Sequence, residues 1–233
     1  MSAPASYTAK VFSLEDIAAD TRILRLALPE GARLVYRAGQ YAQLNLEGGE
    51  PRAFSIASAP HEPFLEFHVK NSHRGFSAAV FNILKQGDAV TVEAPFGEHY
   101  WRPSARPLLA LAGGVGIAPL KAVIEAQLAH QQKTSPVTLY WGVRDEAHLY
   151  LDRYFQSLAA EVAGFTYIPV IAHGEAGGRR NGHIGPAVLE DMPGLAGHDI
   201  YMAGPAAMVT ATLPLLLAQG AEKDFIFSDA FGG

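Results

Sequence analysis

A glycine-rich turn between an apolar run and a helical window is a candidate phosphate site. The segment "LLALAGGVGIAPLKAVIEAQLAH" predicts a buried strand, a turn with Gly113, Gly114 and Gly116, and a helix opened by Pro119. Glycines let the backbone approach a phosphate, and a helix N-terminus offers free N–H groups and positive potential. The turn therefore suits a dinucleotide, and we expect a side chain at Gly116 to obstruct it. Glycine-rich turns also serve packing alone.

Two features depart from the usual dinucleotide fingerprint. Pro119 stands where glycine or alanine is common, and the second strand leads into "GVRDEAHLY" without a clear acidic residue at its end.

The segment "PRAFSIASAP" places one arginine and spaced serines in an apolar run. Alternation predicts a strand with Arg52, Phe54 and Ile56 on one face and Ser55 on the other. From this segment alone, an edge strand whose arginine reaches water is one interpretation, and a ligand-binding arginine is the other.

Other chemistries have little support. The nine histidines show neither H-x-x-H nor H-E-x-x-H spacing, so we predict no metal site. No G-x-S-x-G elbow suggests a serine hydrolase, and the absence of cysteine excludes disulfides, thiolate metal sites and a thiol nucleophile. Arg179 and Arg180 in "GGRRNGH" could contact a nucleotide phosphate, although a solvated loop also explains them.

Composition indicates an ordinary soluble protein. The 233 residues are 49% hydrophobic and 18% charged, with a net charge of −5, which suits one large domain or two small ones. No basic run is long enough to follow a nucleic acid backbone. No window reaches the roughly 18 apolar residues of a membrane span, and no leader pattern is present, so we expect a cytoplasmic protein.

The first hundred residues show β patterning. Alternation in "TRILRLAL" and "FLEFHV" predicts a small antiparallel barrel, and in "FLEFHV" it puts Glu66 and His68 on the face opposite Leu65, Phe67 and Val69. One helical window, "RGFSAAVFNILKQGD", interrupts the strands and is expected to cap the barrel.

The rest of the chain alternates strands and helices. Strands are predicted at "PLLALA", "VTLYW", "FTYIPVI", "DIYMA" and "DFIFS", with helices at about 119–131, 147–162, 185–191 and 205–219. This order indicates a parallel sheet covered by helices on both faces. A connector at 103–106 gives predicted domains of 1–103 and 104–233.

Four segments, in matching order, resemble the ferredoxin–NADP reductase superfamily and most closely its short NAD(P)H:flavin oxidoreductases. They are "RAFSIAS", similar to the flavin signature, "GGVGIAPL", similar to the nicotinamide nucleotide loop, "YMAGPAAM", and the ending "FSDAFGG". The resemblance implies a Greek-key barrel that binds FAD or FMN, followed by a doubly wound α/β domain that binds NADH or NADPH.

The resemblance also implies roles for individual residues in the flavin domain. Arg52 would supply a charge to a flavin phosphate, Phe54 would pack beside the cofactor, and Ser55 would hydrogen-bond the ring near N5. Gly75, Phe76 and Ser77 would form the pyrophosphate turn. The remaining flavin contacts implied are Ile56, His68, Val69 and Lys70.

For the nucleotide domain, the resemblance implies a second set of contacts and two terminal residues. The nucleotide contacts are Gly114, Val115, Gly116, Ala118, Pro119, Gly142, Arg144, Gly204, Pro205 and Met208. Asp229 and Phe231 would cover the flavin ring and, with Ser55, form the catalytic set. We expect nicotinamide and flavin to meet in a cleft between the domains.

This sequence departs from the family pattern in two places. Phe54 replaces the commoner tyrosine, and Ala203 replaces a cysteine that many members place near the nicotinamide. Because this sequence has no cysteine, we also expect no fused plant-type ferredoxin domain of the kind found in larger members.

The function expected is hydride transfer from NAD(P)H to flavin, with the reduced flavin supplied to a partner oxygenase. One alternative is a reductase that retains FAD and passes electrons to a ferredoxin or oxygenase component. A second is a non-catalytic flavin-binding electron-transfer subunit, for which an impaired glycine turn would be expected. The preference between NADH and NADPH stays open.

Overall fold

The computed structural model describes residues 3–130, 135–174 and 177–231, with residues 230 and 231 described by their backbone only. The chain forms two compact units: Met1–Trp101 with Lys121–Gln127, and Arg102–Leu120 with Leu128–Gly233. The predicted boundary at 103 lies close to the end of the first unit's main segment, but nothing in the sequence indicated that Lys121–Gln127 groups with the barrel. No helix of the described residues is long and apolar enough to cross a membrane.

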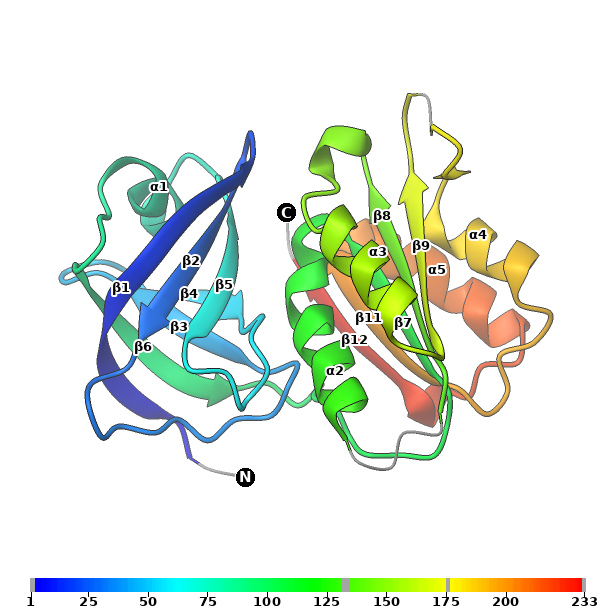
Figure 1. The fold of residues 1–233 in the computed structure, drawn as a ribbon, viewed down its shortest axis with the longest axis horizontal. Coiled ribbons are helices and arrows are strands. Elements are labelled where there is room, and N and C mark those ends of the chain that lie inside the picture. The colour runs from blue at the N-terminus through cyan, green and yellow to red at the C-terminus, as the bar shows by residue number, and fades with distance from the viewer. Residues whose placement is uncertain (1–2, 131–134, 175–176, 232–233) are drawn as a thin grey trace. The chain divides into compact units, whose positions relative to one another are not determined.

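The first unit is a near-closed antiparallel barrel (Figure 1), as predicted. Its strands lie in the order β4-β3-β6-β1-β2-β5. The Ala57 N–H, just after β4, donates to the Glu66 carbonyl of β5 at 2.8 Å, which joins the two ends of this sheet. The strands are β1 (Ala5–Ala18), β2 (Thr21–Ala27), β3 (Tyr41–Asn45), β4 (Arg52–Ser55), β5 (Leu65–Lys70) and β6 (Ala89–Phe96).

Alternating residues fill the barrel as the sequence predicts. Leu65, Phe67 and Val69 of β5 are buried in its core. Helix α1 (Gly75–Asn82) adds Phe76 and Val80 to that core, but it ends before the predicted stop at Gly87.

The second unit contains a parallel sheet in the order β10-β9-β8-β7-β11-β12. From β9 to β12 this is a doubly wound order, in which the chain moves outward from β7 in both directions. The strands are β7 (Leu108–Gly113), β8 (Val137–Val143), β9 (Phe165–Ile171), β10 (Arg180–Asn181), β11 (Asp199–Pro205) and β12 (Ile226–Phe231). The helices are α2 (Ile117–Ala129), α3 (Asp152–Glu161), α4 (Ile184–Asp191) and α5 (Ala206–Ala218), with short 3-10 turns at Gly114–Gly116, Glu146–His148 and Lys223–Phe225.

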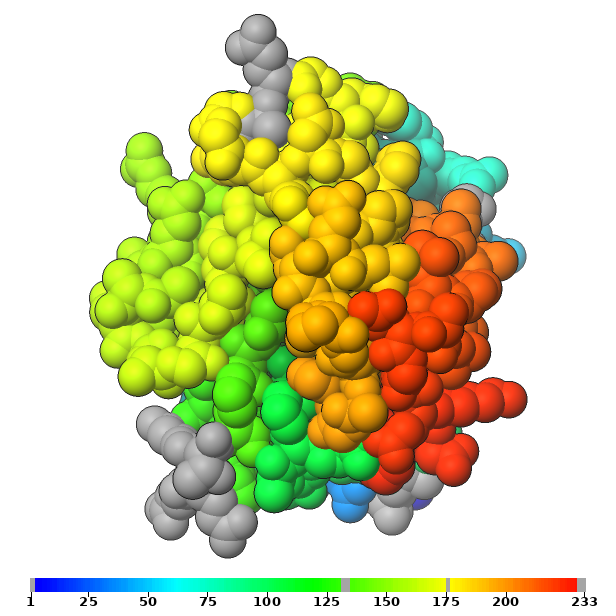
Figure 2. Space-filling view, turned by 90° about the vertical axis from the view of Figure 1, so that its right-hand side faces the viewer, coloured from blue at the N-terminus to red at the C-terminus, as the bar shows by residue number. Residues whose placement is uncertain are grey.

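Adjacent residues of β8 show that helices cover both faces of this sheet. Tyr140 belongs to a core cluster with residues of α4 and α5, whereas Trp141 lies edge-on to Phe155 of α3, with ring centroids 6.1 Å apart. Figure 1 shows α3 in front of the sheet and α4 and α5 behind it. In the space-filling view of Figure 2, the gold surface of α4 meets the orange surface of α5.

Two details of the second unit differ from the sequence prediction. The helix expected from residue 147 begins only at Asp152, after a 3-10 turn. The "GGRRNGH" segment contains the two-residue strand β10, and its arginines are paired: Arg179 with Glu146 and Asp152, and Arg180 with Asp191 and Glu190.

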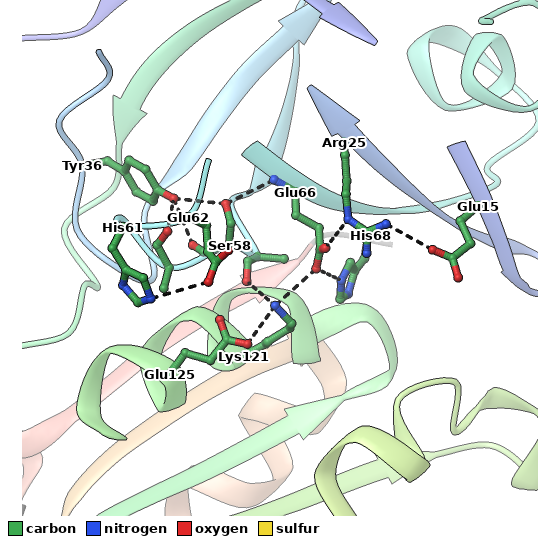
Figure 3. A network of polar contacts seen from close by, with 12 residues as sticks. Glu15, Arg25, Tyr36, Ser58, His61, Glu62, Glu66, His68, Lys121 and Glu125 are labelled. Atoms are coloured by element: carbon green, nitrogen blue, oxygen red, sulfur yellow. Dashed lines mark hydrogen bonds and ion pairs between the residues drawn. The ribbon is translucent and has the colours of Figure 1, made fainter. Parts of the chain in front are cut away.

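The outer face of β5 carries a buried carboxylate that alternation alone did not identify as buried. Glu66 is only 7% exposed, and Figure 3 shows that its carboxylate faces three basic or imidazole groups. Arg25 Nε donates to Oε2 at 2.8 Å, while His68 Nε2 and Lys121 Nζ lie 3.1 and 3.4 Å from Oε1.

These contacts keep Glu66 ionised. Burial raises the pKa of the Glu66 carboxyl, but the hydrogen bond from His68 and the charges of Lys121 and Arg25 outweigh burial and hold that pKa well below its ordinary value of 4.5. Burial lowers the pKa of His68 below its usual 6.5, so the imidazole is neutral at pH 7 and donates its Nε2 proton.

We predict that Glu66→Gln destabilises the protein at pH 7 by roughly 1.5–3 kcal/mol, because the basic partners lose their anion. A carboxyl with a lowered folded pKa stabilises fully above its unfolded value and loses that contribution as pH falls. The difference in free energy of unfolding between the wild type and Glu66→Gln should therefore shrink between pH 7 and pH 3 in urea titrations. A difference that stays constant over this range would contradict the ionised state assigned to Glu66.

Candidate functional site

In the first unit, the start of β4 lies beside the start of α1. A Cβ built on Gly75, which has a φ of +56°, would stand 3.7 Å from Arg52 Nε. The Phe54 and Phe76 rings lie 5.4 Å apart between centroids at 52°. The structure thus brings together Arg52, Phe54, Gly75 and Phe76, which sequence reasoning had linked only by resemblance.

The N-terminus of α1 is suited to an anion. Its cap residue, Arg74, makes no side-chain capping bond, and the first turn holds no acidic residue. Arg52 is 56% exposed, and among the described residues it forms a 3.5 Å ion pair with the still more exposed Glu50. Because a helix N-terminus and an arginine both favour negative charge, the start of α1 and Arg52 together suit a phosphate group.

The Ser77 hydroxyl has other partners in this turn. It lies 2.6 Å from Ser72 Oγ and donates to the Arg74 carbonyl at 3.1 Å. These bonds hold the turn before α1 in shape, so a flavin contact of the Ser77 side chain stays a prediction.

Ser55 at the end of β4 is buried, being 9% exposed, and its Oγ has no hydrogen-bond partner among the residues that the structure describes. A buried hydroxyl without a partner costs about 1–3 kcal/mol. A ligand that hydrogen-bonds Ser55 would remove that cost, which fits the ring contact expected from the sequence.

The other predicted flavin contacts differ in whether their side chains are accessible to a ligand. Ile56 and Val69 are fully buried in the barrel core, so only their backbones are available to a ligand. The His68 side chain is fully buried against Glu66, and Lys70 is exposed near Asp20 at 3.5 Å. A side-chain role of His68 toward flavin therefore has no support in these contacts.

In the second unit, the glycines of the predicted phosphate turn have different roles. A Cβ on Gly116 would lie 2.1 Å from the Ala203 carbonyl oxygen, and one on Gly204 would lie 2.9 Å from Gly113 Cα. These glycines allow the turn and β7 to pack against β11. A side chain at Gly116 would meet protein backbone, and our expectation that it chiefly obstructs a dinucleotide is corrected.

Gly114 is the glycine that faces open space. Its φ is +52°, and a Cβ there would meet no atom of the described chain within 4 Å. It follows β7 directly and precedes α2, which begins at Ile117, so Pro119 stands in the first turn where its missing N–H does no harm. Val115 is partly exposed, whereas Ala118 and Pro119 are buried.

The carboxyl ends of β7 and β11 are neighbours at the point where the strand order reverses, which is where doubly wound sheets bind ligands. Gly114 and Gly204 both lie there. Pro205 and Met208 pack on Gly113, where a Cβ would come within 2.9 and 2.5 Å of their side chains. The structure thus gathers the "GGVGIAPL" and "YMAGPAAM" residues at one edge of the sheet.

At the end of β8, a Cβ on Gly142 would lie 2.7 Å from the Ile184 side chain, so this glycine serves packing. Arg144 is 73% exposed and lies 3.3 Å from Asp145, which also contacts His148 at 2.6 Å. Asp145 is an acidic residue near the end of the second strand that sequence reasoning did not single out. The arginine beside it in "GVRDE" could have pointed to it.

The predicted terminal residues lie along the sheet edge. Asp229 is in β12 in register with Ala203, and the Phe231 backbone is in register with Pro205. The Phe231 side chain is outside the described part of the protein. Within that part, no group of three or more acidic, histidine or cysteine side chains could hold a metal ion.

Comparison with known proteins covers both units. The oxidoreductase FAD-binding domain family matches residues 8–101, and the oxidoreductase NAD-binding domain family matches residues 110–213. The NAD(P)H-flavin reductase of Aliivibrio fischeri is 33% identical over 95% of this chain and 97% of its own length.

Two further relatives are longer than this chain. Terephthalate 1,2-dioxygenase reductase component 2 of Comamonas sp. is 33% identical over 97% of this chain and 68% of its own. The crystal structure of an Amycolatopsis cytochrome P450 reductase superposes with a TM-score of 0.91 and 32% identity, covering 99% of this chain and 71% of that one.

The barrel with its buried serine, the glycine turn at the switch point and these relatives agree on both cofactors, a flavin (FAD or FMN) and NAD(P)H. The chain therefore belongs to the ferredoxin–NADP reductase superfamily of NAD(P)H-dependent flavin oxidoreductases.

Proposed function

We propose that this protein is a flavin reductase that moves a hydride from the nicotinamide C4 of NADH or NADPH to flavin N5 and releases reduced flavin to a partner oxygenase. The observation that carries the flavin half of the proposal is Ser55, a buried hydroxyl without a partner among the described residues, on the same strand as Arg52, which lies near the start of α1.

The bound cofactors supply the chemistry, with nicotinamide as hydride donor and flavin N5 as acceptor. The residues of the barrel bind and orient. Arg52 and the first N–H groups of α1 hold the flavin phosphate, Phe54 packs beside the cofactor, and the Ser55 hydroxyl interacts with the ring near N5. Because charge and protonation at N5 change in the reaction, a hydroxyl there favours the transition state over the bound reactants.

In the α/β unit, Gly114 and the N-terminus of α2 hold the pyrophosphate of the nicotinamide nucleotide. The open space at Gly114 supports this role. The remaining predicted contacts, from Gly142 to Met208, frame the same sheet edge, and we assign Asp229 and Phe231 to the cover of the flavin ring.

The choice of a flavin reductase is supported by the Aliivibrio relative, which is named an NAD(P)H-flavin reductase and is matched over 97% of its length. A second candidate is a reductase that retains FAD and passes electrons to a ferredoxin or oxygenase component. The Comamonas reductase component favours it, as does the N-terminus of α1, which has no side-chain cap and lies beside Arg52. The intact turn at Gly114 argues against a flavin subunit without a nucleotide site.

The experiment that separates the two candidates is the visible spectrum of the purified protein together with NADH and NADPH oxidation. Colourless protein that oxidises either nucleotide only when riboflavin, FMN or FAD is added supports the released-flavin reductase. Yellow protein with near-stoichiometric flavin that reduces a protein carrier supports the retained-flavin enzyme. Failure to oxidise either nucleotide in both assays would refute the proposal.

Arg52→Ala should weaken FMN binding by about 10- to 100-fold, because a charge-assisted bond to phosphate is worth roughly 1.5–3 kcal/mol. Riboflavin, which has no phosphate, should lose much less affinity. The control is Arg33→Ala, which removes another exposed arginine of this unit. Fluorescence titration measures both flavins, and equal losses for FMN and riboflavin would assign Arg52 a structural role.

Ser55→Ala should slow flavin reduction by about 10- to 100-fold, equivalent to roughly 1.4–2.7 kcal/mol, with little change in nicotinamide affinity. Anaerobic stopped-flow at saturating flavin isolates this step. Ser13→Ala is a matched control, because the Ser13 hydroxyl is also buried without a partner in the described part of the chain. A wild-type reduction rate in Ser55→Ala would mean that the serine only packs the barrel.

Gly114→Ala should raise the Michaelis constant for NAD(P)H about tenfold or more and leave flavin affinity unchanged, since its methyl group enters the space proposed for the pyrophosphate. Its positive φ should also cost about 1–2 kcal/mol of stability. Gly31→Ala, with a φ of +75° and open space around it, controls for that strain. If both variants show the same nucleotide kinetics, the assignment of Gly114 fails.

A further inference from the structure

Lys121 lies in the first turns of α2, within the segment Lys121–Gln127 that groups with the barrel. Its side chain is only 13% exposed. The ammonium Nζ lies 2.9 Å from Glu125 Oε1 and 3.4 Å from Glu66 Oε1, and it donates to the Ala57 carbonyl at 3.4 Å. Figure 3 shows this lysine between the two glutamates.

The Ala57 carbonyl belongs to the segment that follows the predicted flavin strand. This segment is bonded at successive residues: the Ile56 N–H donates to the Gln40 carbonyl at 3.0 Å, and the Ala57 N–H donates to the Glu66 carbonyl at 2.8 Å. The Ser58 hydroxyl accepts from the Glu66 N–H at 3.2 Å. Lys121 adds the contact to the carbonyl side of Ala57.

The orientation of the Ser55 side chain depends on this anchoring. Its own hydroxyl has no partner in the described structure, so its side chain is oriented by the backbone on either side. On the N-terminal side β4 pairs with β3, where Ser55 is in register with Tyr41. On the C-terminal side the backbone is held by the bonds of Ile56 and Ala57, and among these bonds the one from Lys121 to the Ala57 carbonyl comes from a charged side chain.

A buried ion pair seldom adds stability over an apolar pair of the same shape, because desolvating the charges offsets their attraction. Buried charges can instead fix one geometry. Methionine would fill the space of Lys121 without desolvating an ammonium. We therefore infer that the main role of Lys121 is to hold its partners in one geometry through its contacts to Glu66, Glu125 and the Ala57 carbonyl, and that added stability is secondary.

We propose that Lys121 is a positioning residue of the flavin site, which holds the Ala57 carbonyl and thereby fixes the orientation in which Ser55 meets the flavin ring. This inference rests on the proposed flavin reduction.

The test compares Lys121→Met, Lys121→Arg and the control Lys10→Met, which removes an exposed lysine of β1. Flavin reduction by NADH is followed anaerobically with saturating FMN, and FMN affinity is measured by fluorescence titration. Lys121→Met should slow reduction about tenfold and change FMN affinity by less than about threefold, because Arg52 still holds the phosphate. Lys121→Arg should recover most of the rate, and Lys10→Met should match the wild type.

The decisive comparison is a double-mutant cycle with Ser55→Ala. If Lys121 acts by orienting Ser55, Lys121→Met should slow the Ser55→Ala enzyme little or not at all. A wild-type rate in Lys121→Met, or losses that simply multiply in the double variant, would overturn the proposal. Both results presuppose that the wild type reduces FMN, and a wild type that does not would refute the proposed function instead.

Circular dichroism and thermal unfolding show whether Lys121→Met folds. If it does not, Glu125→Gln replaces it in the same cycle, because this change loosens Lys121 without removing the ammonium. A slower rate that vanishes in the Ser55→Ala background supports the proposal. An unchanged rate, or a loss that persists undiminished in that background, overturns it.

Discussion

The barrel depends on one buried carboxylate. Glu66 lies directly across from Arg25 in the β2–β5 register, and cross-strand pairs of opposite charge stabilise a sheet. The same carboxylate also faces His68 and Lys121, so β2, β5 and part of α2 meet at one ionised group. Replacing Glu66 would leave Arg25 and Lys121 without this shared anion, which proteins tolerate poorly for partly buried charges. The segment after β4 is hydrogen-bonded to the backbone of Glu66, and these bonds help to fix the position of Ser55 at the end of β4.

The α/β unit depends on a different constraint, the close approach of backbones. The turn after β7 reaches β11 at a distance that only glycine permits, as Gly116 against Ala203 demonstrates. That approach brings the carboxyl ends of β7 and β11 together at the switch point. It also divides the glycines of this edge into two kinds: Gly116 and Gly204 pack the protein against itself, and Gly114 faces open space. The sequence pattern alone does not distinguish these two kinds of glycine.

Sequence reasoning found most of the architecture because the periodicity of apolar residues is a local property. It identified the barrel, the parallel sheet and the inner face of β5. It missed the burial of Glu66, since the Lys121 that pairs with it lies far along the chain and belongs to a helix expected in the other domain. It also placed the start of α3 too early, because Glu146–His148 has helical composition but forms only a 3-10 turn.

For the candidate site, the family resemblance indicated which residues to consider, and the structure distinguishes those whose side chains can reach a ligand from those that offer only backbone. Arg52, Phe54, Gly75 and Phe76 lie together as expected, but the fully buried side chains of Ile56 and Val69 leave only backbone for a ligand. His68 has a clear role in the protein itself, beside Glu66. Such differences follow from the direction in which each side chain points in the near-closed barrel. Alternation of residue types cannot predict this direction where a strand ends, as β4 does at Ser55.

The central claim is that this chain moves a hydride directly from nicotinamide to flavin. Its most direct test is anaerobic stopped-flow reduction of FMN by NADH or NADPH carrying deuterium at C4, in either stereochemical position. The account predicts bleaching of the flavin absorbance within one turnover, slowed by deuterium at one of the two positions and not at the other. Flavin that stays oxidised with both nucleotides would contradict it.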